Sequence, residues 1–186
     1  MLIKNIRLKN KLFFSKVNLF TVAIIIFIFS LISFSSAEAA SLYLRASSNK
    51  VTVGSLVTIN LFVDTQGKTI NNAEAAIQFS NDLVEVVSVS SRSSIFSLWV
   101  EAPSYSNGSG RVSFNGGVPD PGYNGSGGNV MSIIVKAKKA GTASFIFSGA
   151  AVRENDGLGT DILSGQSSAS IVITSNTVEP TKPTDP

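Results

Sequence analysis

The sequence predicts an all-β domain, a sandwich of nine strands, behind an N-terminal export signal. From Ser41 onward, apolar and polar residues alternate with a period of two, and Gly, Asn, Asp, Ser and Pro separate the alternating runs. This pattern is typical of half-buried strands joined by turns. In the same part of the chain, no long stretch has the apolar stripe of an amphipathic helix. Strands with one apolar face bury it against a second sheet, so the pattern predicts two packed layers.

The predicted strands follow one another from residue 42 to residue 174. They are expected at 42–46, 56–64, 72–80, 83–89, 111–115, 130–138, 142–148, 160–164 and 168–174. Residues 95–105 form a looser stretch, and the Gly- and Pro-rich segment 116–128 is expected to be a long loop. Because alternate side chains of a strand point to opposite faces, one apolar set is expected to face the core. These predicted core residues are Val57, Ile59, Leu61, Val63, Ala73, Ala75, Ile77, Phe79, Met131, Ile133, Val135, Ala137, Ala143, Phe145 and Phe147.

Residues 1–39 have the order of a secretory signal peptide. Residues 1–18 are basic and lack acids, residues 19–34 are mostly apolar, and Ala37 and Ala39 are small residues at the positions that signal peptidase reads. The apolar run is shorter than the roughly 20 residues that a permanent membrane helix needs. We therefore expect cleavage after Ala39 and a protein without a membrane segment, secreted or held at the cell surface. The alternative is an uncleaved membrane anchor.

One domain, residues 40–174, is expected between this signal and a C-terminal tail. Residues 175–186 contain Pro180, Pro183 and Pro186 among Thr, Lys, Asp and Glu, with no other apolar side chain after Val178. Such a segment buries too little apolar surface to offset the entropy of ordering it. It is predicted to be a Pro- and Thr-rich linker or a disordered tail.

The absence of Cys and His from the sequence excludes several kinds of catalytic site. The chain cannot form a Ser-His-Asp or Cys-His site, and it lacks the commonest metal ligand. A glycosidase needs two facing carboxylates, and the sequence does not predict that any two of the available acids face each other. These acids are Glu74, Glu85, Glu101 and Asp120. We therefore expect no enzymatic activity, no catalytic residue and no cofactor.

Three further acids, Glu154, Asp156 and Asp161, surround Gly157 and Gly159. Closely spaced carboxylates can bind Ca²⁺, but this spacing does not match the twelve-residue calcium loop, and the terminal Glu of that loop is missing. We interpret the segment as a turn between strands and expect no metal site.

The formal charge of +3 arises from the N-terminal segment. Residues 40–186 carry 10 basic and 11 acidic side chains, so the exported chain is close to neutral. Binding to a phosphate backbone requires a stripe of basic residues, which this part of the sequence lacks. We therefore expect no nucleic acid partner.

Three segments of the domain carry a family resemblance: LYLRASSNKVTVGSLVTINLFVD, INNAEAAIQFSNDLVEVVSV and AGTASFIFSGAAVRENDGLGTDIL. Their succession, from an alternating start to an acidic, Gly-rich loop near the end, resembles the cohesin modules of bacterial cell-surface and cellulosome scaffold proteins. The resemblance covers residues 42–174 and implies a nine-stranded jelly-roll sandwich. It also implies a non-catalytic module that binds dockerin modules of other proteins, in polysaccharide-degrading or cell-surface assemblies.

The resemblance further implies that the partner docks on the flat outer face of one sheet. The outward residues expected on that face come from three predicted strands and are Glu74, Ala76, Gln78, Arg111, Ser113, Asn115, Ser132, Ile134 and Lys136. A face of small and polar residues around one apolar residue can host an interface of about 800 Å² per partner. The simpler interpretation is that this face is only the solvated side of a sandwich.

Two other functions remain open. Trp99, Tyr105 and Tyr123 lie in or beside irregular segments, and exposed aromatic rings can stack on sugars, which predicts a carbohydrate-binding module for polysaccharides. The alternative for Trp99 is that it closes one end of the sandwich. A passive structural or spacer domain of a surface protein is also consistent with the near-neutral chain.

Overall fold

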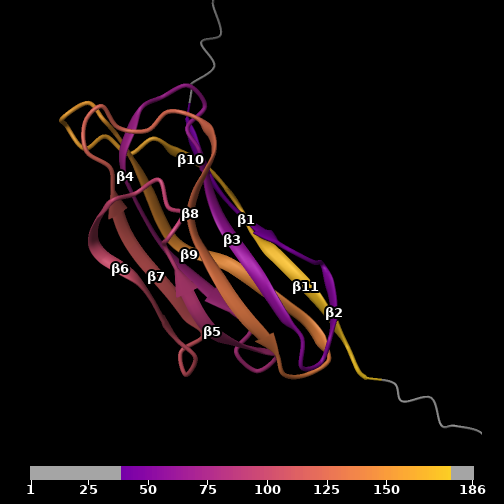
Figure 1. Ribbon diagram of the computed structural model, residues 1–186. Coiled ribbons are helices and arrows are strands. Elements are labelled where there is room, and N and C mark those ends of the chain that lie inside the picture. Colours follow the sequence, from indigo (N-terminus) through magenta and orange to yellow (C-terminus); the bar gives the residue numbers. More distant parts are fainter. Residues whose placement is uncertain (1–38, 177–186) are drawn as a thin grey trace, which may run out of the picture. The chain divides into compact units, whose positions relative to one another are not determined.

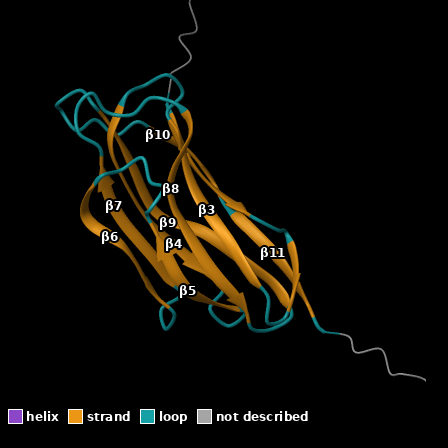
Figure 2. Cartoon of the chain, viewed as in Figure 1, coloured by secondary structure: helices purple, strands orange, loops and turns teal. Residues whose placement is uncertain are grey.

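Two β-sheets packed face to face form the domain (Figure 1). The computed structural model describes residues 39–176, so residues 1–38 of the predicted signal peptide and residues 177–186 of the predicted tail lie outside the described residues. Figure 2 shows strands and loops and no helix among residues 39–176. Within the same residues there is accordingly no helix capable of crossing a membrane. The predicted all-β sandwich is confirmed.

The smaller sheet has five strands in the order β10-β1-β3-β8-β5, and the larger has six in the order β2-β11-β9-β4-β7-β6. The five-stranded sheet contains β1 (Ala40–Ala46), β3 (Leu56–Asp64), β5 (Val84–Ser90), β8 (Ser126–Ala137) and β10 (Leu163–Ser167). The six-stranded sheet contains β2 (Lys50–Thr52), β4 (Ile70–Phe79), β6 (Leu98–Ser106), β7 (Arg111–Gly117), β9 (Gly141–Glu154) and β11 (Ala169–Thr174). β1 pairs with β10, and β2 with β11, in parallel.

All nine predicted strands are present, and the structure adds β2 and β6. β6 occupies the stretch that the sequence left irregular. β9 continues to Glu154 instead of ending at residue 148, because its second half pairs with the first half of β4. The predicted loop 116–128 is shorter than expected, since β7 ends at Gly117 and β8 begins at Ser126. β10 begins at Leu163 instead of residue 160.

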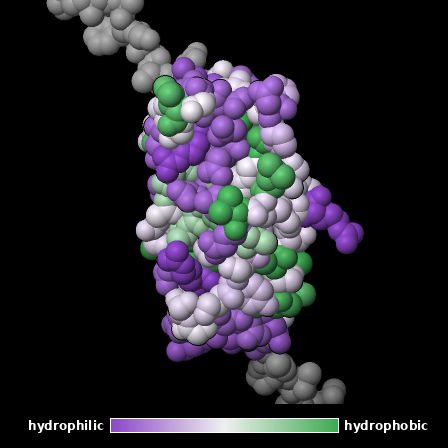
Figure 3. All heavy atoms as spheres, turned by 90° about the vertical axis from the view of Figure 1, so that its left-hand side faces the viewer, coloured by the Kyte–Doolittle hydropathy of each residue, from purple (hydrophilic) through white to green (hydrophobic). Residues whose placement is uncertain are grey.

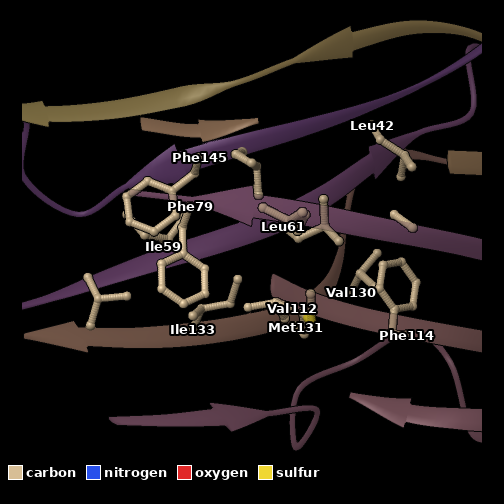
Figure 4. Close-up of a cluster of buried hydrophobic side chains, with 14 of the residues drawn as sticks. Leu42, Ile59, Leu61, Phe79, Val112, Phe114, Val130, Met131, Ile133 and Phe145 are labelled. Atoms are coloured by element: carbon tan, nitrogen blue, oxygen red, sulfur yellow. The ribbon is translucent and has the colours of Figure 1, made fainter. Parts of the chain in front are cut away.

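The apolar sides of the two sheets meet in one core (Figure 4). In Figure 4, Ile59 and Leu61 of the five-stranded sheet lie near Phe79 and Phe145 of the six-stranded sheet. The Phe79 and Phe145 rings stack with their centroids 6.3 Å apart. Each such buried side chain contributes roughly 1.5–3 kcal/mol to folding. The predicted core residues are buried as expected, except that Phe147 is half-buried against the core.

The turn between β6 and β7 reaches across to the edge of the opposite sheet. The Asn107 side chain accepts a hydrogen bond from Val86 N (2.7 Å) and donates one to Val86 O (2.9 Å). Tyr105 Oη donates to Val87 O at 3.0 Å. These contacts satisfy backbone groups on the open edge of β5, where unpaired groups would otherwise invite pairing with another chain. They also hold β6 in place as the last strand of the larger sheet.

Candidate functional site

The nine residues predicted to form one partner-binding face lie on two different sheets. β4 and β7 are neighbours in the six-stranded sheet, whereas β8 lies between β3 and β5 in the other sheet. Ser132, Ile134 and Lys136 of β8 therefore lie on the outer face of the five-stranded sheet, on the other side of the sandwich from β4 and β7. The prediction that all nine share a face is wrong, because alternation along a strand shows which residues point outward but not which sheet holds the strand.

The six remaining residues belong to an ordered array on the outer surface of β9, β4, β7 and β6, which we call the candidate face. Paired residues of neighbouring strands set their side chains side by side, and the pairing arranges this surface in rows that cross the strands. The acidic row contains Ala151, Glu74, Asn115 and Glu101. The small-residue row contains Gly149, Ala76, Ser113 and Ser104. The basic row contains Ile146, Gln78, Arg111 and Ser106.

A hollow of about 340 Å³ opens over the small-residue row. Ala76 forms part of its lining and is only 8% exposed. At Gly149 a Cβ atom would meet nothing within 4 Å, so this side of the hollow is open space. Glu74 and Glu101 line one wall, and Arg111 lies on the other. Figure 3, which views the molecule from the side of β6 and β7, shows polar and apolar residues mixed on this part of the surface.

A bulge in β9 brings Gly149 to the hollow. Ala76 pairs with Gly149 while the next residue, Ile77, pairs with Phe147, so Ser148 is an extra residue in β9. Ser148 Oγ donates to Ala76 O at 3.3 Å, which ties the bulge to β4. Bulges often re-aim side chains beside functional surfaces. Here the bulge allows Phe147 to face the core while Gly149 and Ala151 lie on the outer surface.

Hydrogen bonds hold the acidic row in place around Glu74. Asn115 Nδ2 donates to Glu74 Oε2 at 2.9 Å, and Asn72 Nδ2 donates to Asn115 Oδ1 at 2.8 Å. Arg153 Nη2 lies 3.4 Å from Glu74 Oε1, in an ion pair whose side chains are both partly exposed. Both oxygens of Glu74 are therefore engaged within the domain. A pair this exposed contributes at most about 1 kcal/mol to stability, so its main effect is to orient the carboxylate.

Glu101 and Arg111 differ from Glu74 because neither forms an ion pair within residues 39–176. Glu101 Oε1 accepts hydrogen bonds from Ser113 Oγ at 2.6 Å and from Ser104 Oγ at 3.4 Å. Within residues 39–176, the ion pairs are Lys68–Glu154 and Arg153–Glu74, and neither Glu101 nor Arg111 takes part in one. The hollow thus has an unpaired carboxylate on one wall and an unpaired guanidinium on the other.

The structure brings two of the possible catalytic carboxylates, Glu74 and Glu101, to the same row. Both carboxylates accept hydrogen bonds from hydroxyl, amide or guanidinium groups within the domain.

The three aromatic residues predicted for sugar stacking do not form a platform. Trp99 points inward and meets Phe96 and Phe114 edge to face, with centroid distances of 6.1 and 6.5 Å. This supports the alternative interpretation, in which Trp99 closes part of the core. Tyr105 is 41% exposed, but it lies apart from the other two rings and is tied to β5 through its hydroxyl.

Tyr123 is half-buried and packs against the core, whereas a ring that stacks on a sugar must be exposed. Its ring packs so closely on Gly128 that a Cβ there would approach Cε1 to 2.6 Å. Burial raises the pKa of its hydroxyl, and the nearby Tyr43 and Asp64 raise it further. The ring is part of the packing at this end of the sandwich.

The acids between β9 and β10 serve as turn caps. Asp156 Oδ1 accepts hydrogen bonds from the backbone N of Leu158 and Gly159, and its other oxygen accepts one from the Thr160 hydroxyl. The Thr160 hydrogen bond is the main cause that lowers the pKa of Asp156. Asp161 Oδ1 accepts from the backbone N of Val152 and Leu163. The interpretation of this segment as a turn is supported.

No protein-family model and no curated protein matches the chain. Solved structures do match it. The cohesin of a type I cohesin–dockerin complex from Clostridium thermocellum has a TM-score of 0.63 at 14% identity, over 74% of this chain and 94% of that one. A cohesin module of a family 33 glycoside hydrolase from Clostridium perfringens has a TM-score of 0.60 at 13% identity, over 75% and 99% of the two chains. The domain has the cohesin fold.

A third similar structure comes from a scaffoldin of another bacterium. The sixth cohesin of scaffoldin B from Acetivibrio cellulolyticus, solved with a Cel5 dockerin, has a TM-score of 0.57 at 14% identity, over 72% of this chain and 99% of that one. The family resemblance noted in the sequence is confirmed for the fold of this cohesin-like domain. At these identities the likeness concerns architecture only.

Sequence reasoning missed the residues that β6 and β9 add to the candidate face: Glu101, Ser104, Gly149, Ala151 and Arg153. For β9 a signal was available, because outward and inward residues still alternate from Gly149 to Arg153 once one bulge residue is allowed. For β6 the signal is weak, since two register shifts interrupt its pairing with β7.

Proposed function

We propose that the cohesin-like domain is a non-catalytic binding module that recognises a dockerin-type protein through the candidate face. The observation that carries the proposal is the hollow over the small-residue row, bounded by charged rows that intramolecular hydrogen bonds partly hold in place. Preorganised polar groups around a recess reduce the entropy that binding costs. Two of the similar cohesins are solved as complexes with dockerins, which supports the same class of partner here.

A protein partner fits this face better than a polysaccharide does. Among the residues that line the hollow, Phe114 is the one aromatic residue, and its side chain is 2% exposed because it belongs to the core. Without an exposed ring the hollow lacks the flat apolar surface on which sugars stack. Its charged walls instead suit the charged and polar side chains of a protein.

The site of action follows from the export signal predicted at residues 1–39. We propose that the module works outside the cell, as a secreted or surface-held protein. A role in polysaccharide degradation is part of the same proposal. One of the similar cohesins is a module of a glycoside hydrolase, which supports that context.

Binding of purified dockerin modules to residues 40–186, measured by isothermal titration calorimetry, tests the proposal. Gly149→Gln places a side chain in the hollow, and neither backbone geometry nor a neighbouring atom opposes it. A dockerin that binds the unaltered protein is expected to lose about thirtyfold or more in affinity, because a side chain then occupies the hollow that the partner must enter.

Ile134→Asp is the matched control, since Ile134 lies on the outer face of the opposite sheet and should leave the affinity unchanged. The proposal fails if no dockerin in a broad panel binds. It also fails if Ile134→Asp abolishes binding while Gly149→Gln does not.

A further inference from the structure

The two walls of the hollow carry opposite charges that the domain itself does not neutralise. Glu101 stands in the acidic row and Arg111 in the basic row, and both line the hollow. Glu101 pairs with Asn115, which lies four residues from Arg111 along β7. At the rise of an antiparallel strand, the backbone positions of the two rows are about 13 Å apart along the strand direction. The Glu101 carboxylate reaches over the small-residue row to Ser113, two residues from Arg111, so the two charges lie nearer to each other than the rows do.

One oxygen of the Glu101 carboxylate accepts no hydrogen bond from residues 39–176. Both hydrogen bonds from Ser104 and Ser113 go to Oε1, and Oε2 accepts none from residues 39–176. The two serines fix the carboxylate without supplying a positive charge. An exposed carboxylate held in one orientation loses little further entropy when a cation binds it, and charge-assisted hydrogen bonds are the stronger kind.

Exposed apolar side chains flank the charges. Leu98 and Val100 precede Glu101 on β6 and are 57% and 84% exposed. Ile146 shares the basic row with Arg111 and is 48% exposed. A partner that covers these apolar residues also shields the charges from water, which strengthens their electrostatic attraction to opposite charges.

From this arrangement, and resting on the proposed function of the same face, we infer the charge pattern of the partner. The partner is a protein surface that presents a cationic side chain to Glu101 and an anionic side chain to Arg111, with apolar residues beside the cation. A neutral glycan offers neither charge, and a nucleic acid offers no cation for Glu101.

A display experiment tests this inference without a known partner. A yeast-displayed helical scaffold with randomised surface positions is selected against residues 40–186. Clones that bind through the hollow are identified by their loss of binding to Gly149→Gln. These clones are expected to lose at least about tenfold in affinity for Glu101→Arg and for Arg111→Glu, and to regain it when the facing charge on the scaffold is reversed. Glu101→Gln keeps an acceptor for the two serines, so it should also weaken the affinity of the clones, but by less than Glu101→Arg does.

Glu85→Arg, on β5 of the other sheet, is the control and should change nothing for these clones. Unchanged melting temperatures show that the variants are folded. Hollow-dependent clones that bind both charge reversals within threefold of the unaltered protein overturn the inference, and so does a selection that yields no hollow-dependent clone. Neither result depends on dockerins, so a negative dockerin panel contradicts the proposed function separately.

Discussion

The two outer faces of the sandwich are built by the same alternation but differ in shape. On the six-stranded sheet, a row of Gly, Ala and Ser residues leaves a hollow between rows of larger residues. On the five-stranded sheet, Tyr43 and Phe62 sit opposite each other on β1 and β3, with their rings stacked at 5.3 Å. Arg45 lies over the Tyr43 ring at 5.9 Å.

Apolar rings on an outer face are therefore not wholly available to a partner. The Tyr43 and Phe62 rings are half-buried, and each covers one face of the other. The candidate face has smaller residues, and the charges of Glu101 and Arg111 beside its hollow have no ion-pair partner within residues 39–176. We therefore expect substitutions on the six-stranded face to change binding and those on the five-stranded face to change mainly stability.

The largest expected difference between the faces concerns Ala76. Ala76→Arg fills the hollow from its floor and should weaken partner binding by about thirtyfold or more, the effect of removing an interface hot spot. The corresponding change Ile134→Arg on β8 should leave the affinity within threefold. Surface plasmon resonance with the bound dockerin measures both variants. Equal losses for the two variants would remove the distinction between the faces.

A smaller effect is expected for Phe62 on the five-stranded face. Phe62→Ala removes the stacked pair with Tyr43 and should lower the free energy of unfolding by about 1–2 kcal/mol, while partner affinity stays unchanged. Urea denaturation measures the loss. Phe62→Leu keeps apolar area but no ring, so it should lose less. If Phe62→Ala weakened partner binding, the assignment of this face to stability would be incorrect.

Asn115 allows a matched test of the polar networks. Asn115→Ala removes the donor to Glu74 and the acceptor for Asn72, which should cost about 1 kcal/mol of stability and also weaken binding. Asn60 of β3 accepts from Ser132 Oγ at 2.7 Å on the opposite face. Asn60→Ala should cost a similar amount of stability and leave binding unchanged. Urea denaturation and calorimetry of the two variants separate the roles.

The smallest effect is a pH dependence at the turn that supports Arg153. Arg153 Nη1 donates to Gly159 O at 3.2 Å, and Asp156 caps the same turn. Because hydrogen bonds lower the pKa of Asp156 in the folded protein, its contribution to stability is present above the unfolded pKa, near 4. The contribution is lost as the pH falls through the folded pKa. Urea denaturation from pH 6 to pH 2 should show a shallower loss in Asp156→Asn, and identical profiles would refute the assignment.

Side-chain direction and core membership could be predicted from the sequence alone. The alternation at Ile59, Leu61, Ile133 and Val135 indicates inward residues, and all four are buried. This works because the pleat of a strand fixes side-chain direction locally, whatever strand lies beside it. For the same reason, Glu74, Ala76 and Gln78 could be placed on an outer face without any knowledge of the topology.

Only the tertiary structure decided which strands share a sheet. It separated Ile134 from Ala76, joined β6 and the second half of β9 to the candidate face, and turned Trp99 inward against Phe114. Sheet membership depends on pairing between residues far apart in the chain, and no local pattern encodes it. The domain's inward residues were determined by the sequence, whereas the hollow and its two charged walls exist only because four separate strands pair in this register.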